Sequence, residues 1–237
     1  MKKIMWMLVL VLALGGSPLG AQERARDRAR EALPAEVFQG IEALAQEVAR
    51  DGAPTDPLFS KALEGLAKRV PVDRIIPVVT AYSHRLREAR GAFGSGAGEP
   101  VVVAGADALQ RGVDVEALRQ LGREGPGGPG GPGEGLGPSP MAVLVLADLV
   151  EAGVPAQRAL GVVHEAMRQR AREQEMLGLS GQVRHLMRQG QSPQQAAEQV
   201  RQALQRGRGG GMAPPVPPGS KPVTAGLPRG KKGKGGG

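Results

Sequence analysis

The chain of 237 residues contains no cysteine and no asparagine, and aromatic residues make up only 2% of it. Without cysteine there is neither a disulfide nor thiol chemistry, so packing alone must hold the fold. Without asparagine there is no N-glycosylation sequon. The scarcity of aromatic side chains argues against a surface that stacks single-stranded nucleic acid or sugar rings.

Acidic residues are missing from the C-terminal segment 206–237, which carries seven basic residues. Residues 22–205 hold 22 basic and 23 acidic residues, so this body is close to neutral and shows no nucleic-acid-binding charge. Glycine and proline dominate the C-terminal segment, which predicts a disordered basic tail. We expect weak contact with an anionic membrane or lipopolysaccharide through its basic cluster, Arg229, Lys231, Lys232 and Lys234.

Residues 1–21 have the pattern of a bacterial secretory signal peptide. Two lysines precede an unbroken apolar run of eleven residues, Ile4 to Leu14. Small residues follow, and we place the cleavage after Ala21. A retained membrane anchor is the alternative, but the run spans only about half of the ~30 Å hydrocarbon core. The sequence therefore predicts a periplasmic or secreted protein with a charged N-terminal segment at 22–33.

One short phrase recurs through the chain, each time around a turn between two amphipathic stretches. Glycine suits the left-handed position just past a helix end, and a valine after it can pack back on that helix. Proline, aspartate or serine then favours the start of the next helix. The pattern predicts helix–corner–helix units with structural positions at Gly52, Gly112, Gly153, Gly190, Val70, Val113 and Val154.

The predicted fold class is all-α, built from tandem two-helix units. The segment 101–106, VVVAGA, has a strand-like composition, but it aligns with a longer helical pattern and is taken as helix. The corners at Val70, Val113 and Val154 are spaced by 43 and 41 residues, the length of a HEAT or armadillo two-helix repeat. Two architectures fit this spacing: a short, irregular array of stacked units, or a single helical bundle.

A Gly/Pro-rich linker at 122–139 separates two predicted helical lobes, 34–121 and 140–205. Its Gly-Pro-Gly triplets are far too few for a collagen triple helix. The linker either interrupts one array or joins two halves, because similar corners lie on both sides of it. In the first lobe we expect a long helix from 72 to 90, which Pro77 should kink or begin.

The candidate metal ligands are histidines paired with a glutamate or a methionine. His84 and Glu88 are spaced by four residues and share a helix face, but no further ligand accompanies them. Soft ligands for a periplasmic metal are the other option, from His164 with Met167 and from His185 with Met187. Met167 fits the apolar stripe of its helix and methionine is common core filler, so packing is the favoured interpretation of these pairs.

Two carboxylates, Asp107 and Asp148, occupy the same repeat position. Paired carboxylates can perform acid–base chemistry, but recurrence by repetition favours a structural ion pair, for which Arg74 and Arg158 are the expected partners. The adjacent Ser83 and His84 point apart on a helix and cannot form a nucleophile–base pair.

The sequence shows no complete catalytic constellation and no cofactor motif. It predicts an exported, non-enzymatic helical scaffold or adaptor that contacts a protein partner in the bacterial envelope, without catalytic, cofactor or metal residues and without a specific nucleic acid. The alternatives are a periplasmic envelope-stress or metal-sensing protein that uses His and Met, and an enzyme of unknown class.

Cleavage after Ala21 predicts a mature protein that begins at Gln22. Because Trp6 is the only tryptophan, the mature form should show no tryptophan fluorescence. N-terminal sequencing and the emission spectrum of exported material check this prediction. A chain that keeps Trp6 and fractionates with membranes would contradict it.

Overall fold

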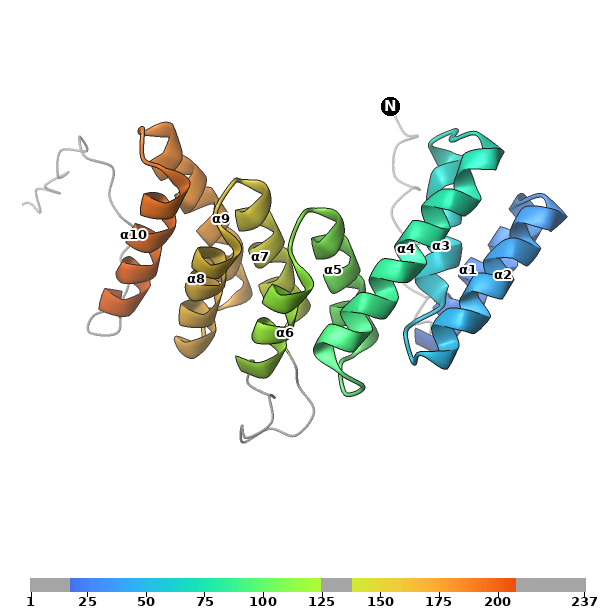
Figure 1. Ribbon diagram of the computed structural model, residues 1–237, viewed down its shortest axis with the longest axis horizontal. Coiled ribbons are helices and arrows are strands. Elements are labelled where there is room, and N and C mark those ends of the chain that lie inside the picture. Colours follow the sequence, from blue (N-terminus) through green and yellow to red (C-terminus); the bar gives the residue numbers. More distant parts are fainter. Residues whose placement is uncertain (1–17, 125–137, 208–237) are drawn as a thin grey trace, which may run out of the picture.

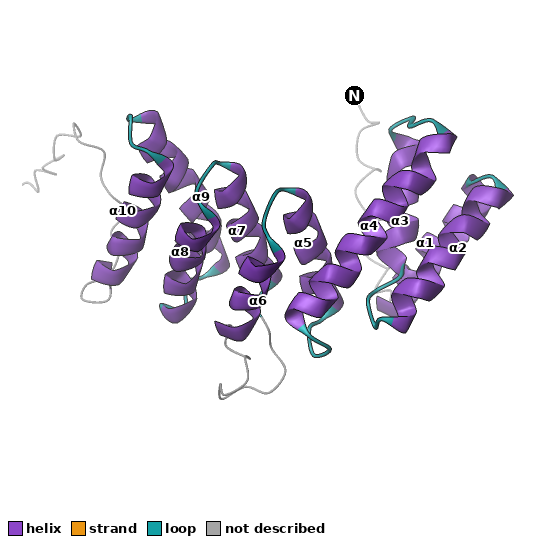
Figure 2. Ribbon diagram, in the orientation of Figure 1, coloured by secondary structure: helices purple, strands orange, loops and turns teal. Residues whose placement is uncertain are grey.

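Helices make up almost all of the described chain. The computed structural model describes residues 18–124 and 138–207, and within these ranges it contains ten helices and no strand (Figure 2). The all-α class is confirmed, and the segment 101–106 is helical. The helices are α1 (Pro18–Ala32), α2 (Ala35–Arg50), α3 (Asp56–Ala67), α4 (Val72–Phe93), α5 (Glu99–Gln110), α6 (Val115–Glu124), α7 (Pro140–Glu151), α8 (Ala156–Arg168), α9 (Glu173–Arg188) and α10 (Pro193–Arg206).

All five predicted corners end a helix at a left-handed residue. At the corner between α7 and α8, Gly153 has φ +90°. The Val154 N–H donates to the Leu149 carbonyl at 3.0 Å, and the Gly153 N–H donates to the Val150 carbonyl at 2.9 Å. These two bonds form a Schellman motif, which satisfies carbonyls that the helix end leaves without a partner. The same pair of bonds closes the corners at Gly52, Arg69, Gly112 and Gly190.

A sixth corner of the same kind joins α8 to α9 and has no glycine. Arg170 has φ +54°, and the Ala171 N–H donates to the Ala166 carbonyl at 3.0 Å. This corner was not predicted, because an arginine gives no sequence signal for a left-handed residue. Arg69 adopts φ +57° at the equivalent position. An L-residue with a side chain is strained in this region by roughly 1–2 kcal/mol, so the closing hydrogen bonds and the packing must offset that cost.

The ten helices are stacked in two layers along the long axis of the molecule (Figure 1). Helices α1, α3, α5, α7 and α9 form the odd layer, and α2, α4, α6, α8 and α10 form the even layer. Within a layer, neighbouring helices are two places apart in the chain, as α5 is to α7 and α8 is to α10. This is the arrangement of a helical-repeat array, and it follows from six similar corners that each turn the chain back.

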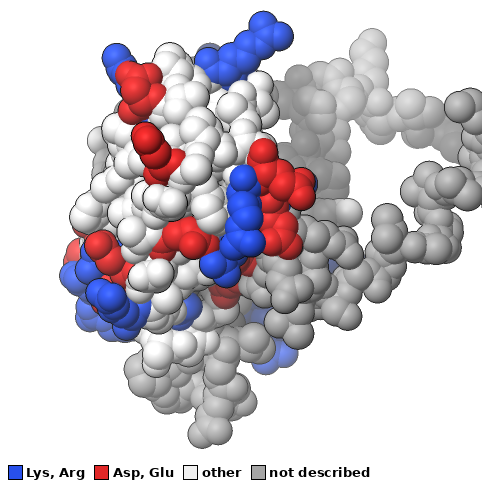
Figure 3. Space-filling model, turned by 90° about the vertical axis from the view of Figure 1, so that its right-hand side faces the viewer, with Lys and Arg blue, Asp and Glu red and all other residues white. Residues whose placement is uncertain are grey.

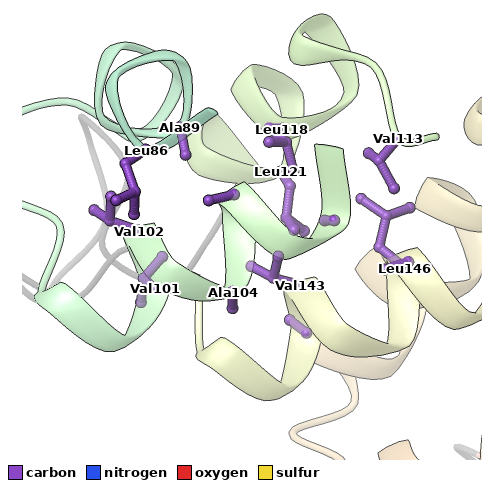
Figure 4. Packing of buried hydrophobic residues seen from close by; sticks show 14 of the residues in the cluster. Leu86, Ala89, Val101, Val102, Ala104, Val113, Leu118, Leu121, Val143 and Leu146 are labelled. Atoms are coloured by element: carbon purple, nitrogen blue, oxygen red, sulfur yellow. The ribbon is translucent and has the colours of Figure 1, made fainter. Parts of the chain in front are cut away.

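The core is continuous on both sides of the Gly/Pro-rich linker. Figure 4 shows Val143 and Leu146 of α7 close to Leu118 and Leu121 of α6, with Val113 from the preceding corner beside them. All five side chains are buried. The two predicted lobes are therefore packed together in one array, and α7 begins at Pro140 as predicted. Helix α6 continues to Glu124, and residues 125–137 of the linker lie outside the described residues.

The N-terminal half contains one helix that was not predicted, and its α4 helix begins at Val72 as expected. Segment 22–33, which we placed outside the helical lobe, belongs to α1, a helix that packs on α3. It does so through Ala25, Ala29 and Leu33, whose spacing of four residues lines up three small or apolar side chains. Pro77 does not begin a helix, because α4 runs from Val72 through it without interruption.

The left-handed position of a corner is occupied by a glycine at Gly153 and by an arginine at Arg69, and substitutions at these two residues should change stability in opposite directions. Gly153→Val should lower the free energy of unfolding by about 1–2 kcal/mol, because an added Cβ is strained at φ +90°. Gly153→Asn should cost less. Arg69→Gly is the matched variant and should raise stability by up to about 1 kcal/mol. Urea unfolding checks all three, and equal tolerance of valine and asparagine would reject the corner model.

Candidate binding groove

Polar links tie the odd layer together between α5, α7 and α9. The Arg111 guanidinium, just past α5, pairs with Asp148 and Glu151 of α7. The Ser180 hydroxyl of α9 donates to Asp148 at 3.4 Å. Asp148 thus has the predicted structural role, but its partner is Arg111 of the preceding unit. Arg158, which we expected to pair with it, lies 3.5 Å from Glu198 of α10 instead.

The odd layer is open between α3 and α5. These two helices would be neighbours in the layer, yet they do not pack closely on one another, and α5 packs mainly on α4 and α7. A groove of about 420 Å³ occupies this position, with α3 and α5 as its walls and α4 as its floor. We call it the α3–α5 groove, and it is lined by Ala25, Asp56, Pro57, Ser60, Lys61, Glu64, Tyr82, Glu99, Val103 and Asp107.

The repeat explains why Asp107 has no ionic partner here. In the next unit the equivalent Asp148 is matched by Arg111, the residue before the left-handed corner glycine. The residue at that place one unit earlier is Lys68, and it pairs with Glu64 of its own helix. No hydrogen-bond donor or cation is found paired with the Asp107 carboxylate among the described residues. The carboxylate therefore lines the groove without a salt bridge.

Burial raises the pKa values of two groove carboxyls, Asp56 and Asp107. It raises the pKa of Asp107, although Lys61 and Arg85 nearby act in the opposite direction. It also raises the pKa of Asp56, whose Oδ2 atom is buried without a hydrogen-bond partner. Glu64 differs, because hydrogen bonds from Lys68 and Lys61 lower its pKa. At neutral pH the groove thus holds two partly desolvated carboxylates that lack the pairing Glu64 has.

Tyr82 forms part of the groove floor, and its side chain is only 4% exposed. Burial, with the negative charge of Asp107, raises the pKa of its phenol, so the group stays protonated at neutral pH. The Lys61 ammonium lies 5.6 Å from the ring centroid and the Arg85 guanidinium 5.9 Å from it. No sequence motif indicates that this buried phenol lines a recess.

Glu165 is the most deeply buried carboxylate among the described residues, and its surroundings indicate a structural role. Gln169 donates to it at 2.9 Å, Arg168 at 2.6 Å and Gln205 of α10 at 3.2 Å. These donors, Gln169 foremost, hold the pKa of Glu165 below its usual range. The side chain therefore stays charged and links α8 to α10.

The predicted metal pairs do not converge in the part of the chain that is described. No group of three His, Asp or Glu side chains there is arranged to hold a metal ion. His84 and Glu88 are exposed on α4. Met167 and Met187 pack against the hydrophobic core, and His185 shares a contact of 3.0 Å with Gln189.

The structural corner residues lie where the sequence placed them. Val113 and Val154 are buried, at 3% and 2% exposure, so they fill the core and offer no apolar docking surface. The basic cluster of the tail, Arg229 to Lys234, lies outside the described residues. On the end of the array at the right of Figure 1, acidic and basic side chains are interspersed (Figure 3). That face agrees with the near-neutral charge of residues 22–205.

Comparison of the chain with protein-family models, with curated proteins and with solved structures found no match. Across residues 18–124 and 138–207, no helix has the length and apolar composition needed to cross a membrane. The interpretation of the groove therefore depends on its own geometry and charges.

The two equivalent aspartates should respond oppositely to neutralisation. Burial disfavours the charged form of Asp107, so Asp107→Asn should leave the free energy of unfolding at pH 7 unchanged or raise it by a few tenths of a kcal/mol. Asp148→Asn should lower it by about 1 kcal/mol, because a partly buried pair with Arg111 is lost. Urea unfolding of both variants is the measurement. Equal losses would mean that Asp107 has a stabilising partner.

Proposed function

We propose that this protein is an exported, non-enzymatic helical scaffold that binds a protein partner along its two-layered array. The single observation that carries the proposal is the stack of helices from α1 to α10, joined by repeated corners and with a groove where α3 and α5 do not pack closely. Stacked helical units present an extended surface, which repeat proteins use for binding.

Export is part of the proposal and is supported by the sequence of residues 1–21, with two lysines, an apolar run and small residues before Ala21. The predicted cleavage position lies in the first turn of α1. Cleavage there leaves Ala25, Ala29 and Leu33 in the mature chain, so the contacts of α1 with α3 are retained.

A second part of the proposal concerns the basic tail. Its cluster carries four positive charges in six residues, next to a body that is close to neutral. At ~1 kcal/mol for each basic residue near anionic lipid, four residues supply about 4 kcal/mol at most. That free energy corresponds to a dissociation constant near ~1 mM. The tail therefore biases the scaffold toward an anionic envelope surface, while partner recognition belongs to the helices.

The surface attachment has a direct test with the full-length chain. A variant with Arg229, Lys231, Lys232 and Lys234 changed to Ser should lose most of its binding to vesicles that contain anionic lipid. Binding of the unmodified chain should fade as salt rises to physiological strength, because exposed charges are then screened beyond ~8–10 Å. Co-sedimentation measures both effects. Binding that survives the substitution and high salt would move surface recognition to the helices.

A further inference from the structure

We propose that the α3–α5 groove is a docking site for the basic cluster of this chain's own tail, Arg229, Lys231, Lys232 and Lys234. The two parts have complementary charge. The recess is lined by four carboxylates and one ammonium group, and all charged residues of the C-terminal segment are basic. This inference does not depend on attachment of the tail to an anionic surface.

The groove lacks cationic partners for two of its carboxylates, and the basic cluster would supply them. Glu64 is already balanced by Lys61 and Lys68, whereas Asp56 and Asp107, which also line the groove, form no salt bridge within the described residues. A lysine ammonium or arginine guanidinium in the groove would donate to these carboxylates. Charge-assisted hydrogen bonds of this kind are roughly twice as strong as neutral ones.

Tyr82 is the second observation that points to a ligand. Its side chain is 96% buried and lines the groove floor, with Lys61 and Arg85 beside the ring, and within the described residues no hydrogen bond of its hydroxyl is found. Buried phenols usually have a hydrogen-bond partner for the hydroxyl. An ammonium group that enters between Asp56 and Asp107 would donate to the Tyr82 hydroxyl oxygen as well as to the carboxylates.

The groove and the cluster are also compatible in size. A cavity of about 420 Å³ falls within the ~300–1,000 Å³ of sites that hold small ligands, so it has room for a lysine side chain. Glycines are interspersed among the basic residues of the cluster, at Gly230, Gly233 and Gly235. Residues without a side chain allow the backbone of the segment to approach the rim of the groove closely.

The tail is long enough to reach the groove within one molecule. Between the end of α10 at Arg206 and the centre of the cluster at Lys231 lie about 24 residues, which span up to ~80 Å when extended. From α10 to α4, which forms the groove floor, the path crosses three helix spacings of 8–10 Å, past α8 and α6, or roughly 25–30 Å. Docking in the same chain is therefore sterically accessible. It also makes the groove and an anionic surface competitors for one cluster.

Cysteine cross-linking tests the proposal cleanly, because the natural chain has no cysteine. The test variant is the full-length chain with Ser60→Cys, an exposed groove residue, and Gly233→Cys, between two lysines. The control pairs Gly233→Cys with Ala203→Cys, an exposed residue of α10 closer along the chain to the tail. We expect the groove pair to form a disulfide within one chain at least several-fold faster than the control pair.

Neutralising the groove should then remove the advantage. Adding Asp56→Asn and Asp107→Asn should slow the Ser60–Gly233 cross-link about tenfold and leave the Ala203–Gly233 control unchanged. With both aspartates in place, anionic vesicles should also slow the Ser60–Gly233 cross-link. Thermal unfolding of each variant verifies that the fold is retained. A groove pair no faster than the control, a rate indifferent to the two aspartates, or a product that joins two chains would each overturn docking within the chain.

The same variants separate this inference from the proposed function. The two Asp→Asn substitutions should leave vesicle binding intact or strengthen it, because the tail cluster is then released from the groove. Vesicle binding without a groove-specific cross-link would reject only the groove proposal. A groove-specific cross-link without vesicle binding would reject only the surface attachment.

Discussion

The left-handed residue at the end of a helix is the constraint on which this structure depends. Six times, one residue at positive φ lets two backbone N–H groups reach back to carbonyls of the helix just completed. Each of these bonds fixes the direction in which the chain leaves, so the next helix begins at a set angle to the previous one. Because the six corners are alike, the helices stack in order, and the apolar faces meet without long connections.

The array could be predicted from the sequence where a corner contains glycine and proline or serine, as at Gly153-Val154-Pro155. It could not be predicted where the same conformation is held by Arg170, because tertiary packing there overrides the intrinsic preference of the residue. Helix α1 was missed for another reason. Its charged residues dominate its composition, and only the spacing of Ala25, Ala29 and Leu33 indicates a buried face.

The groove could not be predicted from the sequence at all, because it is a gap between α3 and α5 and not a motif. The alignment of Asp107 with Asp148 did identify equivalent positions, but it gave the wrong arginine as the partner. The pairing depends on which unit a side chain leans toward, and a single sequence does not contain that information. Lys68 is the deciding residue, since it pairs with Glu64 in its own helix and leaves Asp107 unmatched.

The direct packing of α5 on α7 and of α6 on α8 has a consequence for the segment between them. Residues 125–137 connect two helix ends whose positions are already set by the core. The entropy of closing such a connection grows only with the logarithm of its length, by about 0.6 kcal/mol for each doubling. Lengthening it therefore costs the fold little, which makes this point of the array open to insertion of new sequence, whereas the corners, with their single left-handed residue, are not.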